Sequence, residues 1–64
     1  MNLLDILWEN INKDFIIYDL NDNLIAMGNA GNLFTELGYF FLNLKVVKVT
    51  DEFIIVNINL GGEE

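Results

Sequence analysis

Six residue types are missing from this sequence: cysteine, histidine, arginine, serine, glutamine and proline. Without cysteine there is no disulfide, and without cysteine or histidine the usual ligands of a structural zinc site are gone. Ser/His and Cys/His nucleophile pairs and bidentate arginine clamps are excluded in the same way. The chain has 64 residues and so no room for a separate catalytic module. We therefore expect no enzyme, no cofactor and no metal centre.

Positive charge is scarce in this chain. Three lysines, Lys13, Lys45 and Lys48, stand against ten acidic residues, which gives a formal net charge of -7. This is the wrong sign for binding nucleic acid directly or for lying on an anionic membrane, and we expect neither partner. The plain role of such a charge is to keep a small protein soluble. The alternative is that its carboxylates imitate the phosphates of nucleic acid and occupy a basic groove on another protein.

Hydrophobic residues nevertheless make up 53% of the chain, which excludes a disordered acidic tail. For this mass, apolar burial is worth on the order of 95 kcal/mol, and ordering the chain at about 1.5 kcal/mol per residue costs about the same. The two terms cancel, and neither a disulfide nor a zinc site can shift the balance. We therefore predict a homo-oligomer, most simply a two-fold dimer, which buries further apolar surface between copies.

The hydrophobic pattern predicts a helix of about three turns over residues 1–12. Asn2 and Asp5 are spaced as a capping pair at its start. Acidic and asparagine side chains take one side of this helix, and apolar side chains recur at helical spacing on the other. The apolar set is Leu3, Leu4, Leu7, Trp8 and Ile11.

Two β-hairpins follow in the sequence. The first joins apolar or β-rich runs at residues 15–18 and 24–27 through a turn rich in asparagine and aspartate. The second joins residues 46–49 and 53–58 through a short polar turn. Between the hairpins, helical spacing and Gly38 as a C-terminal stop predict one or two helical turns over residues 32–37. Over residues 32–44 as a whole, the pattern leaves helix and strand open.

This order of elements predicts a single α+β domain over residues 1–60, with a flexible tail at residues 61–64. Short connections make each hairpin antiparallel, so we expect a four-stranded antiparallel sheet with the N-terminal helix packed on one face. A short helical turn joins the two hairpins. An uncharged, β-branched edge of this sheet is a template for pairing with a second copy.

Two short motifs resemble ligand sites, and each has a plainer interpretation. Asp19, Asn21 and Asn23 match the first positions of an EF-hand calcium loop, but the glycine and the bidentate glutamate of such a loop are missing. We therefore predict a hairpin turn there. Residues 28–32 follow a strand and precede a helical turn, as a phosphate-binding loop does. No lysine lies near them in the sequence, and glycines that provide backbone freedom at the strand exit are the preferred interpretation.

Carboxylates occur in pairs, as Asp5 with Glu9, Asp14 with Asp19, and Asp51 with Glu52. General acid and base work needs two carboxyls in different environments inside a cleft, whereas these pairs lie on a polar helix face or at turns. We interpret all three pairs as solvated surface.

Aromatic side chains, eight in all, are more than so small an interior can easily hide beside its other apolar residues. Most are expected in the core, and the run at residues 39–41 is the candidate for an exposed interaction patch. Its partner is either a second copy or a foreign protein. Acidic residues are added as candidates because their charge would determine which partner binds. The candidate interaction residues are Tyr39, Phe40, Phe41, Asp5, Glu9, Asp51 and Glu52.

The chain also resembles a class of known proteins. Its short acidic helix, its Asn/Asp-rich hairpin at residues 18–25 (YDLNDNLI) and its closing hairpin at residues 46–56 (VVKVTDEFIIV) look like the small acidic orphan proteins of bacteriophages and mobile elements. Several of these are anti-CRISPR or other anti-defence inhibitors. The resemblance covers most of the chain in style, and it assigns a role to no individual residue.

Our leading hypothesis is a non-enzymatic, oligomeric interaction protein in the bacterial host cytoplasm. It would inhibit a host protein, such as an antiviral defence component, by occupying its surface, with partial mimicry of nucleic acid. Two alternatives come from other classes: a protein that sequesters a nucleotide-like signal, and a phage structural or assembly protein. Ten asparagines that can hydrogen-bond a polar small molecule keep the ligand alternative open.

Overall fold

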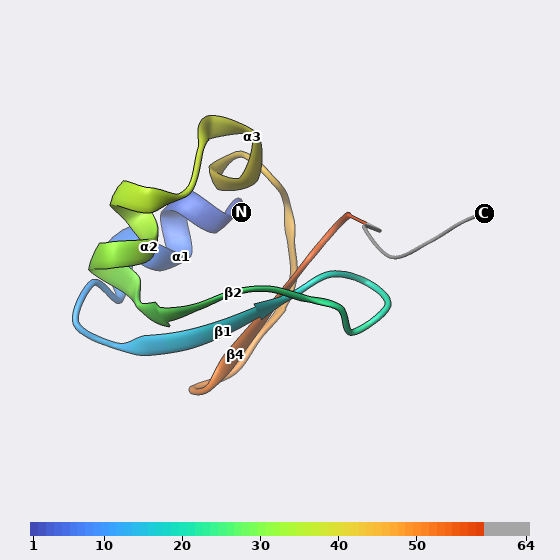
Figure 1. Cartoon of the computed structure of the whole chain (residues 1–64), viewed down its shortest axis with the longest axis horizontal. Helices are drawn as coiled ribbons and strands as arrows, with labels where there is room; N and C mark the ends of the chain where they lie inside the picture. Colours follow the sequence, from blue (N-terminus) through green and yellow to red (C-terminus); the bar gives the residue numbers. More distant parts are fainter. Residues whose placement is uncertain (59–64) are drawn as a thin grey trace.

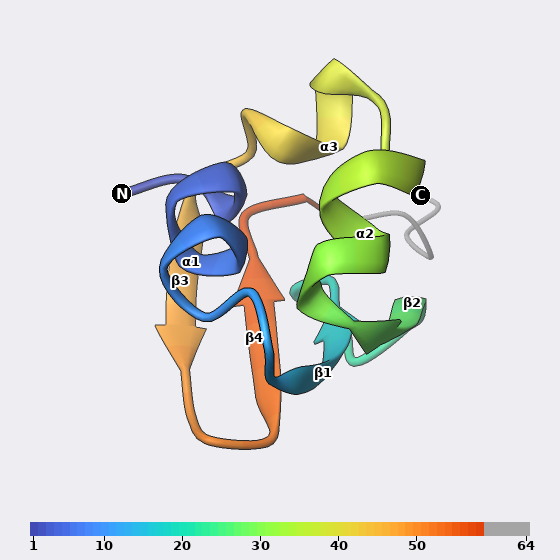
Figure 2. The ribbon, with the colours of Figure 1, turned by 90° about the vertical axis from the view of Figure 1, so that its left-hand side faces the viewer.

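The computed structural model describes residues 1–58, and within this range it confirms the predicted α+β class. Three short helices lie on one side of a four-stranded sheet (Figure 1, Figure 2). The predicted tail at residues 61–64 and the last two residues of the predicted domain lie outside the described residues. The elements in chain order are α1 (Leu3–Glu9), β1 (Asp14–Tyr18), β2 (Leu24–Asn29), α2 (Ala30–Glu36), α3 (Tyr39–Leu42), β3 (Val46–Val49) and β4 (Phe53–Val56).

Both predicted hairpins are present, since β1 pairs antiparallel with β2 and β3 pairs antiparallel with β4. The expectation of a purely antiparallel sheet is wrong. The strand order is β2-β1-β4-β3, and the two inner strands, β1 and β4, run parallel. The cause is the connection between the hairpins. Helices α2 and α3 carry the chain from the β2 edge to the β3 edge, and β3 begins at the end of the sheet where β2 begins. The mixed sheet follows from this crossover.

The hydrophobic core lies between the helices and one face of the sheet. Along β1 and β4 the buried residues alternate with residues that are half-buried or exposed, as expected when one face is covered. The core is made of Leu3, Ile6, Leu7, Phe15, Ile17, Ala30, Leu33, Leu42, Ile54 and Val56.

Helix α1 begins with the predicted cap and is shorter than predicted. The Asn2 side chain accepts a hydrogen bond from the backbone N–H of Asp5 (3.0 Å), and the Asp5 carboxylate accepts one from the N–H of Asn2 (3.2 Å). The helix ends after Glu9, because Asn10 donates its side-chain amide to the carbonyl oxygen of Ile6 (2.9 Å) and closes the last turn. Residues 11 and 12 therefore belong to the turn that follows.

Replacing Asn2 with alanine removes this cap. We expect a loss of about 1 kcal/mol in unfolding free energy, because the N–H of Asp5 loses its acceptor. Chemical denaturation monitored by circular dichroism measures the loss. Asn2→Asp keeps the acceptor and should retain most of the stability; an equal loss in both variants would contradict a capping role.

The segment between the hairpins is helical in two pieces. Helix α2 covers most of the predicted helical turns and is capped by Asn29, whose side chain accepts a hydrogen bond from the N–H of Gly31 (2.9 Å). Gly38 is not the left-handed stop expected of it: its φ of -76° is ordinary, and it precedes α3 as the N-cap. Residues 39–42, which the sequence left open, thus form a helix. Gly28 has a φ of +142°, which agrees with backbone freedom at the strand exit.

Candidate functional site: a helical surface and an open sheet face

Two surfaces with exposed apolar side chains lie on opposite sides of the sheet. The first, which we call the helical surface, is formed by the outer sides of α1, α2 and α3 (Figure 2). The second, which we call the open sheet face, is the side of the sheet that no helix in residues 1–58 covers (Figure 1). The described part of the chain holds no cluster of three His, Cys, Asp or Glu side chains suited to a metal ion. No helix in residues 1–58 is both long and apolar enough to span a membrane.

The helical surface carries the predicted aromatic residues. In α3, Tyr39 is 80% exposed and Phe40 is 63% exposed, whereas Phe41 is half-buried with its ring edge-on to that of Phe40 (centroids 5.2 Å apart). Trp8 was predicted on the inner side of the first helix, and this is wrong: it is 63% exposed and packs on Phe34 of α2, with ring centroids 5.5 Å apart. The two-turn helix α1 turns Trp8 toward its neighbour α2, and no further element lies over it.

A shallow pocket of about 440 Å³ lies in this surface between α1, α2 and α3. Exposed Tyr39 and half-buried Phe34 contribute to its wall, and Trp8 packs on Phe34 beside it. Its residues are Leu4, Phe34, Thr35, Leu37, Gly38, Tyr39 and Leu42. Such a pocket with aromatic rims fits an apolar side chain of a partner protein.

The charge of the helical surface has one sign. Asp5, Glu9 and Glu36 are the charged residues of α1, α2 and α3, and all three are exposed. This confirms the predicted exposure of Asp5 and Glu9. Apolar anchors flanked by carboxylates complement a partner surface that is apolar and basic.

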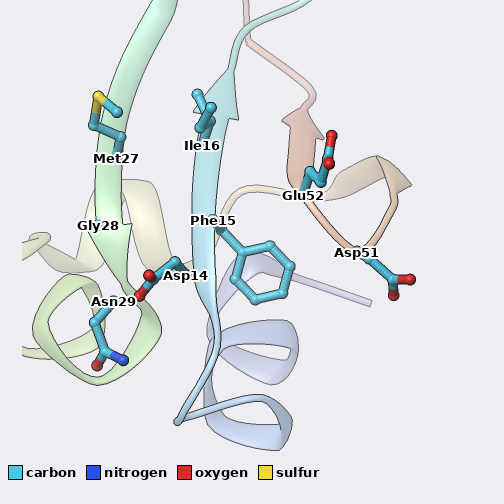
Figure 3. A pocket seen from close by; sticks show the side chains of 8 residues that line it. All are labelled: Asp14, Phe15, Ile16, Met27, Gly28, Asn29, Asp51 and Glu52. Carbon is cyan, nitrogen blue, oxygen red and sulfur yellow. The ribbon is translucent and has the colours of Figure 1, made fainter.

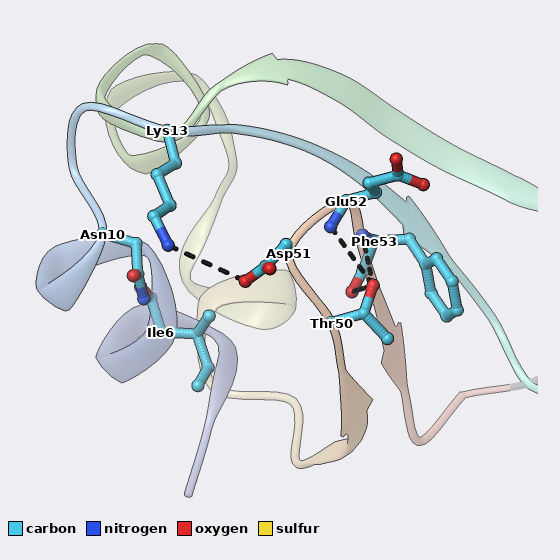
Figure 4. A network of polar contacts seen from close by, with 7 residues as sticks. All are labelled: Ile6, Asn10, Lys13, Thr50, Asp51, Glu52 and Phe53. Atoms are coloured by element: carbon cyan, nitrogen blue, oxygen red, sulfur yellow. Dashed lines mark hydrogen bonds and ion pairs between the residues drawn. The ribbon is translucent and has the colours of Figure 1, made fainter.

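Asp51 and Glu52 lie in the β3–β4 turn, at the opposite end of the fold from α3 (Figure 2). The structure therefore does not join all seven predicted interaction residues into one patch. Asp51 lies instead beside Lys13, with 3.9 Å between the Lys13 Nζ and a carboxylate oxygen (Figure 4). It also borders a pocket that includes Glu9. The turn itself is held by Thr50. Its hydroxyl oxygen accepts hydrogen bonds from the backbone N–H groups of Glu52 (3.2 Å) and Phe53 (3.0 Å).

The motif that resembled a calcium loop is a turn built on Asp19. One Asp19 carboxylate oxygen accepts the backbone N–H groups of Asn21 (2.8 Å) and Asn23 (2.9 Å), and the other accepts the Asn23 side-chain amide (2.9 Å). Asp19 is fully buried, so its interpretation as solvated surface is wrong. Its carboxylate serves the turn, while Asp22 at the tip takes the left-handed backbone (φ 64°) that Asx residues tolerate.

The open sheet face is the feature that the sequence interpretation missed. Its side chains are half-buried or exposed, and they form a continuous apolar layer across β2, β1 and β4. We define it by Ile16, Tyr18, Leu24, Met27, Phe53 and Ile55. The pairing places Ile16 between Met27 and Phe53, and the rings of Tyr18 and Phe53 meet edge to face with centroids 6.2 Å apart.

One end of this face is hollowed into an open pocket of about 500 Å³ (Figure 3). Its floor includes Ile16 and Met27, and carboxylates of Asp14, Asp51 and Glu52 border it. The described pocket wall contains no lysine. A phosphate-bearing ligand would meet like charge here, so this pocket does not favour the nucleotide-like ligand of the alternative hypothesis.

A signal for the open sheet face was present in the sequence. Residues 15–18 (FIIY) and 53–56 (FIIV) have apolar side chains at every position, so both faces of each strand are apolar. Such uninterrupted runs are typical of strands that are covered on both sides. In a fold with helices on one side, they predict an apolar face that remains open.

Comparisons with known proteins give no family. No protein-family model matches the chain, and neither the curated proteins nor the solved structures that were searched contain a match.

Proposed function

We propose that the chain is a non-enzymatic interaction protein that inhibits a bacterial host protein by covering one of its surfaces. The observation that carries the proposal is the helical surface: it exposes Trp8, Tyr39 and Phe40, has a shallow pocket that Tyr39 lines, and carries acidic residues as the charged side chains of its helices. Aromatic anchors of this kind concentrate binding energy at protein interfaces. The target is a protein with an apolar and basic patch, of the kind that nucleic-acid-binding defence components present.

The charge argues for competition with nucleic acid at the target. A basic groove that binds phosphates attracts carboxylates as well, and the net charge of -7 speeds encounter with it. The three carboxylates of the helices are few for a full imitation of a nucleic-acid backbone. We therefore assign affinity to the aromatic side chains and the choice of partner to the charge. The resemblance to small phage-encoded inhibitors supports an antiviral defence component as the target and the host cytoplasm as the place of action.

The test is a pull-down from bacterial lysate with the immobilised chain, followed by mass spectrometry and an activity assay of the captured protein. We expect a basic protein whose capture weakens as salt is raised and whose activity falls when the chain is added. A captured small molecule without a protein would favour the ligand alternative instead. Capture that is insensitive to salt, or that leaves the activity of the captured protein unchanged, would count against the proposal.

Phe40→Asp should weaken capture by about 10-fold or more, because an exposed aromatic anchor is lost. The new carboxylate is negative and a basic partner would attract it. Weaker binding would therefore come from the loss of the aromatic ring and not from the added charge. Leu20→Asp adds the same charge at a residue of the β1–β2 turn that is 47% exposed, and it serves as the matched control. Equal capture by Phe40→Asp and the unmodified chain would show that α3 is not the contact.

A further inference from the structure

We infer that the open sheet face is the interface of a homodimer, in which two copies pack their sheets face to face. The inference is independent of the proposed function, which rests on the opposite side of the molecule. It assigns a surface to the homo-oligomer that the size of the chain predicts.

The first argument is the composition of the face. Ile16, Phe53 and Ile55 lie on the two inner strands and point away from the helices, yet they are large and apolar. Met27 (62% exposed) and Leu24 (57% exposed) extend this layer onto β2. A monomer would leave this side of the sheet in water, whereas sheets with one solvated face normally alternate apolar and polar residues. The pattern is that of a sheet with a second layer over it.

The charge on this side of the sheet disfavours an anionic partner. Two charged residues occupy paired strand positions on this side: Asp14, opposite Asn29, and Lys48, opposite Ile55 and with its Nζ 5.9 Å from the Phe53 ring centroid. Asp14, Asp51 and Glu52 border the same side at one end. This acidic border repels nucleic acid and anionic membranes. A second copy matches the apolar centre with its own, and the Lys48 side chains offset part of the repulsion between the two acidic borders.

The third argument is area. The chain exposes 4051 Å² in total, and one side of a compact body is about a sixth of this, so two sheet faces would bury about 1,300 Å² together. Stable and specific interfaces bury about 1,200–2,000 Å², so a contact that covers this whole side of the sheet reaches the lower end of that range. Aligned packing of two sheets about 10 Å apart is an established way of forming a core between them.

The dimer has a consequence for binding. A two-fold axis in the plane between the sheets places the helices of the two copies on opposite outer sides, with both helical surfaces accessible. The assembly would then carry two equal binding surfaces that face in opposite directions.

Met27→Asp tests the interface, with Phe40→Asp as the matched control. The two side chains are exposed to almost the same extent, 62% and 63%, and each variant adds one negative charge. Sedimentation equilibrium should show the unmodified chain at twice its mass of 7.3 kDa at micromolar concentration. Met27→Asp should raise the dimer dissociation constant by at least about 100-fold, because it buries an unpaired carboxylate in each copy. Phe40→Asp should change it by less than about threefold, since Phe40 lies on the opposite side.

Ile16→Thr distinguishes a dimer that packs through the open sheet face from one that pairs along the edge of the sheet. Ile16 lies on the inner strand β1, so pairing of two copies along the β2 edge would not involve its side chain. Threonine favours strands but places a hydroxyl in the interface, and we expect weaker dimers at unchanged circular dichroism. Weakening by Met27→Asp alone would indicate edge pairing and overturn the inference. A monomer at all concentrations, or equal weakening by Met27→Asp and Phe40→Asp, would overturn it as well.

Discussion

Ile17→Ala should leave the chain largely unfolded at 25 °C. Ile17 is completely buried in the middle of β1, between Ala26 of β2 and Ile54 of β4. Replacing a buried isoleucine with alanine costs about 2–5 kcal/mol, since the apolar contacts are lost and a cavity stays behind. A core of this size supplies about 3–5 kcal/mol in total, so the substitution removes most of it. Urea denaturation followed by circular dichroism measures the loss.

Its neighbour Ile16 provides the control on the same strand. Ile16 is half-buried on the open sheet face and packs on no part of the core between sheet and helices. Ile16→Ala should cost about 1 kcal/mol or less in dilute solution, and more as protein concentration rises and dimers form. Equal losses in the two variants at low concentration would contradict the division of β1 into a core side and an open side.

Asp19→Ala should destabilise the chain by about 2–3 kcal/mol. The carboxylate is buried and accepts the backbone N–H groups of Asn21 and Asn23, which alanine would leave without this acceptor. Hydrogen bonds to a charged group are worth about 1.5–3 kcal/mol each, and part of this is recovered when water reaches the opened turn. Thermal or urea unfolding of the variant gives the value.

Two variants at neighbouring positions separate hydrogen bonding from charge. Asp19→Asn keeps one side-chain oxygen as an acceptor and should lower the free energy of unfolding by about 1 kcal/mol. The new side-chain NH₂ group would face the NH₂ group of Asn23, and neither can accept a hydrogen bond from the other. Asp22→Asn removes the same charge at the exposed tip and should be close to neutral, since asparagine accepts the left-handed backbone there. A full loss in Asp22→Asn would show that net charge, and not the turn, governs the effect.

The elements that could be predicted from the sequence are those that local patterns specify. The capping pair of Asn2 and Asp5, the two hairpins and the part of α2 from residue 32 onward each depend on residues close together in the chain. The parallel pairing of β1 with β4 could not be predicted in this way, because it depends on a crossover in which α3, only four residues long, gives almost no periodic signal.

The site was predictable to a smaller extent. Exposure of Tyr39 and Phe40 was expected from the surplus of aromatic residues and is confirmed. Trp8 was missed because helical spacing places it with the apolar residues, while the layer that would cover it does not exist in the described chain. Asp19 was missed because a carboxylate between polar residues looks solvated, although its own turn buries it. The open sheet face was missed because the pattern of a strand shows that both of its sides are apolar, whereas what covers each side depends on where the helices pack.

In the proposed dimer, the open sheet face is buried between two copies while the helical surface remains exposed. The chain has two methionines: Met27 lies on the open sheet face, whereas Met1 lies outside it and serves as an exposed reference, and the single chain exposes them to 62% and 71%. In a chain labelled with ¹³C-methyl methionine, a soluble paramagnetic agent should broaden the Met1 signal and spare that of Met27 at high protein concentration. On dilution, Met27 should broaden as well. Equal broadening of both methyl signals at all concentrations would contradict the account.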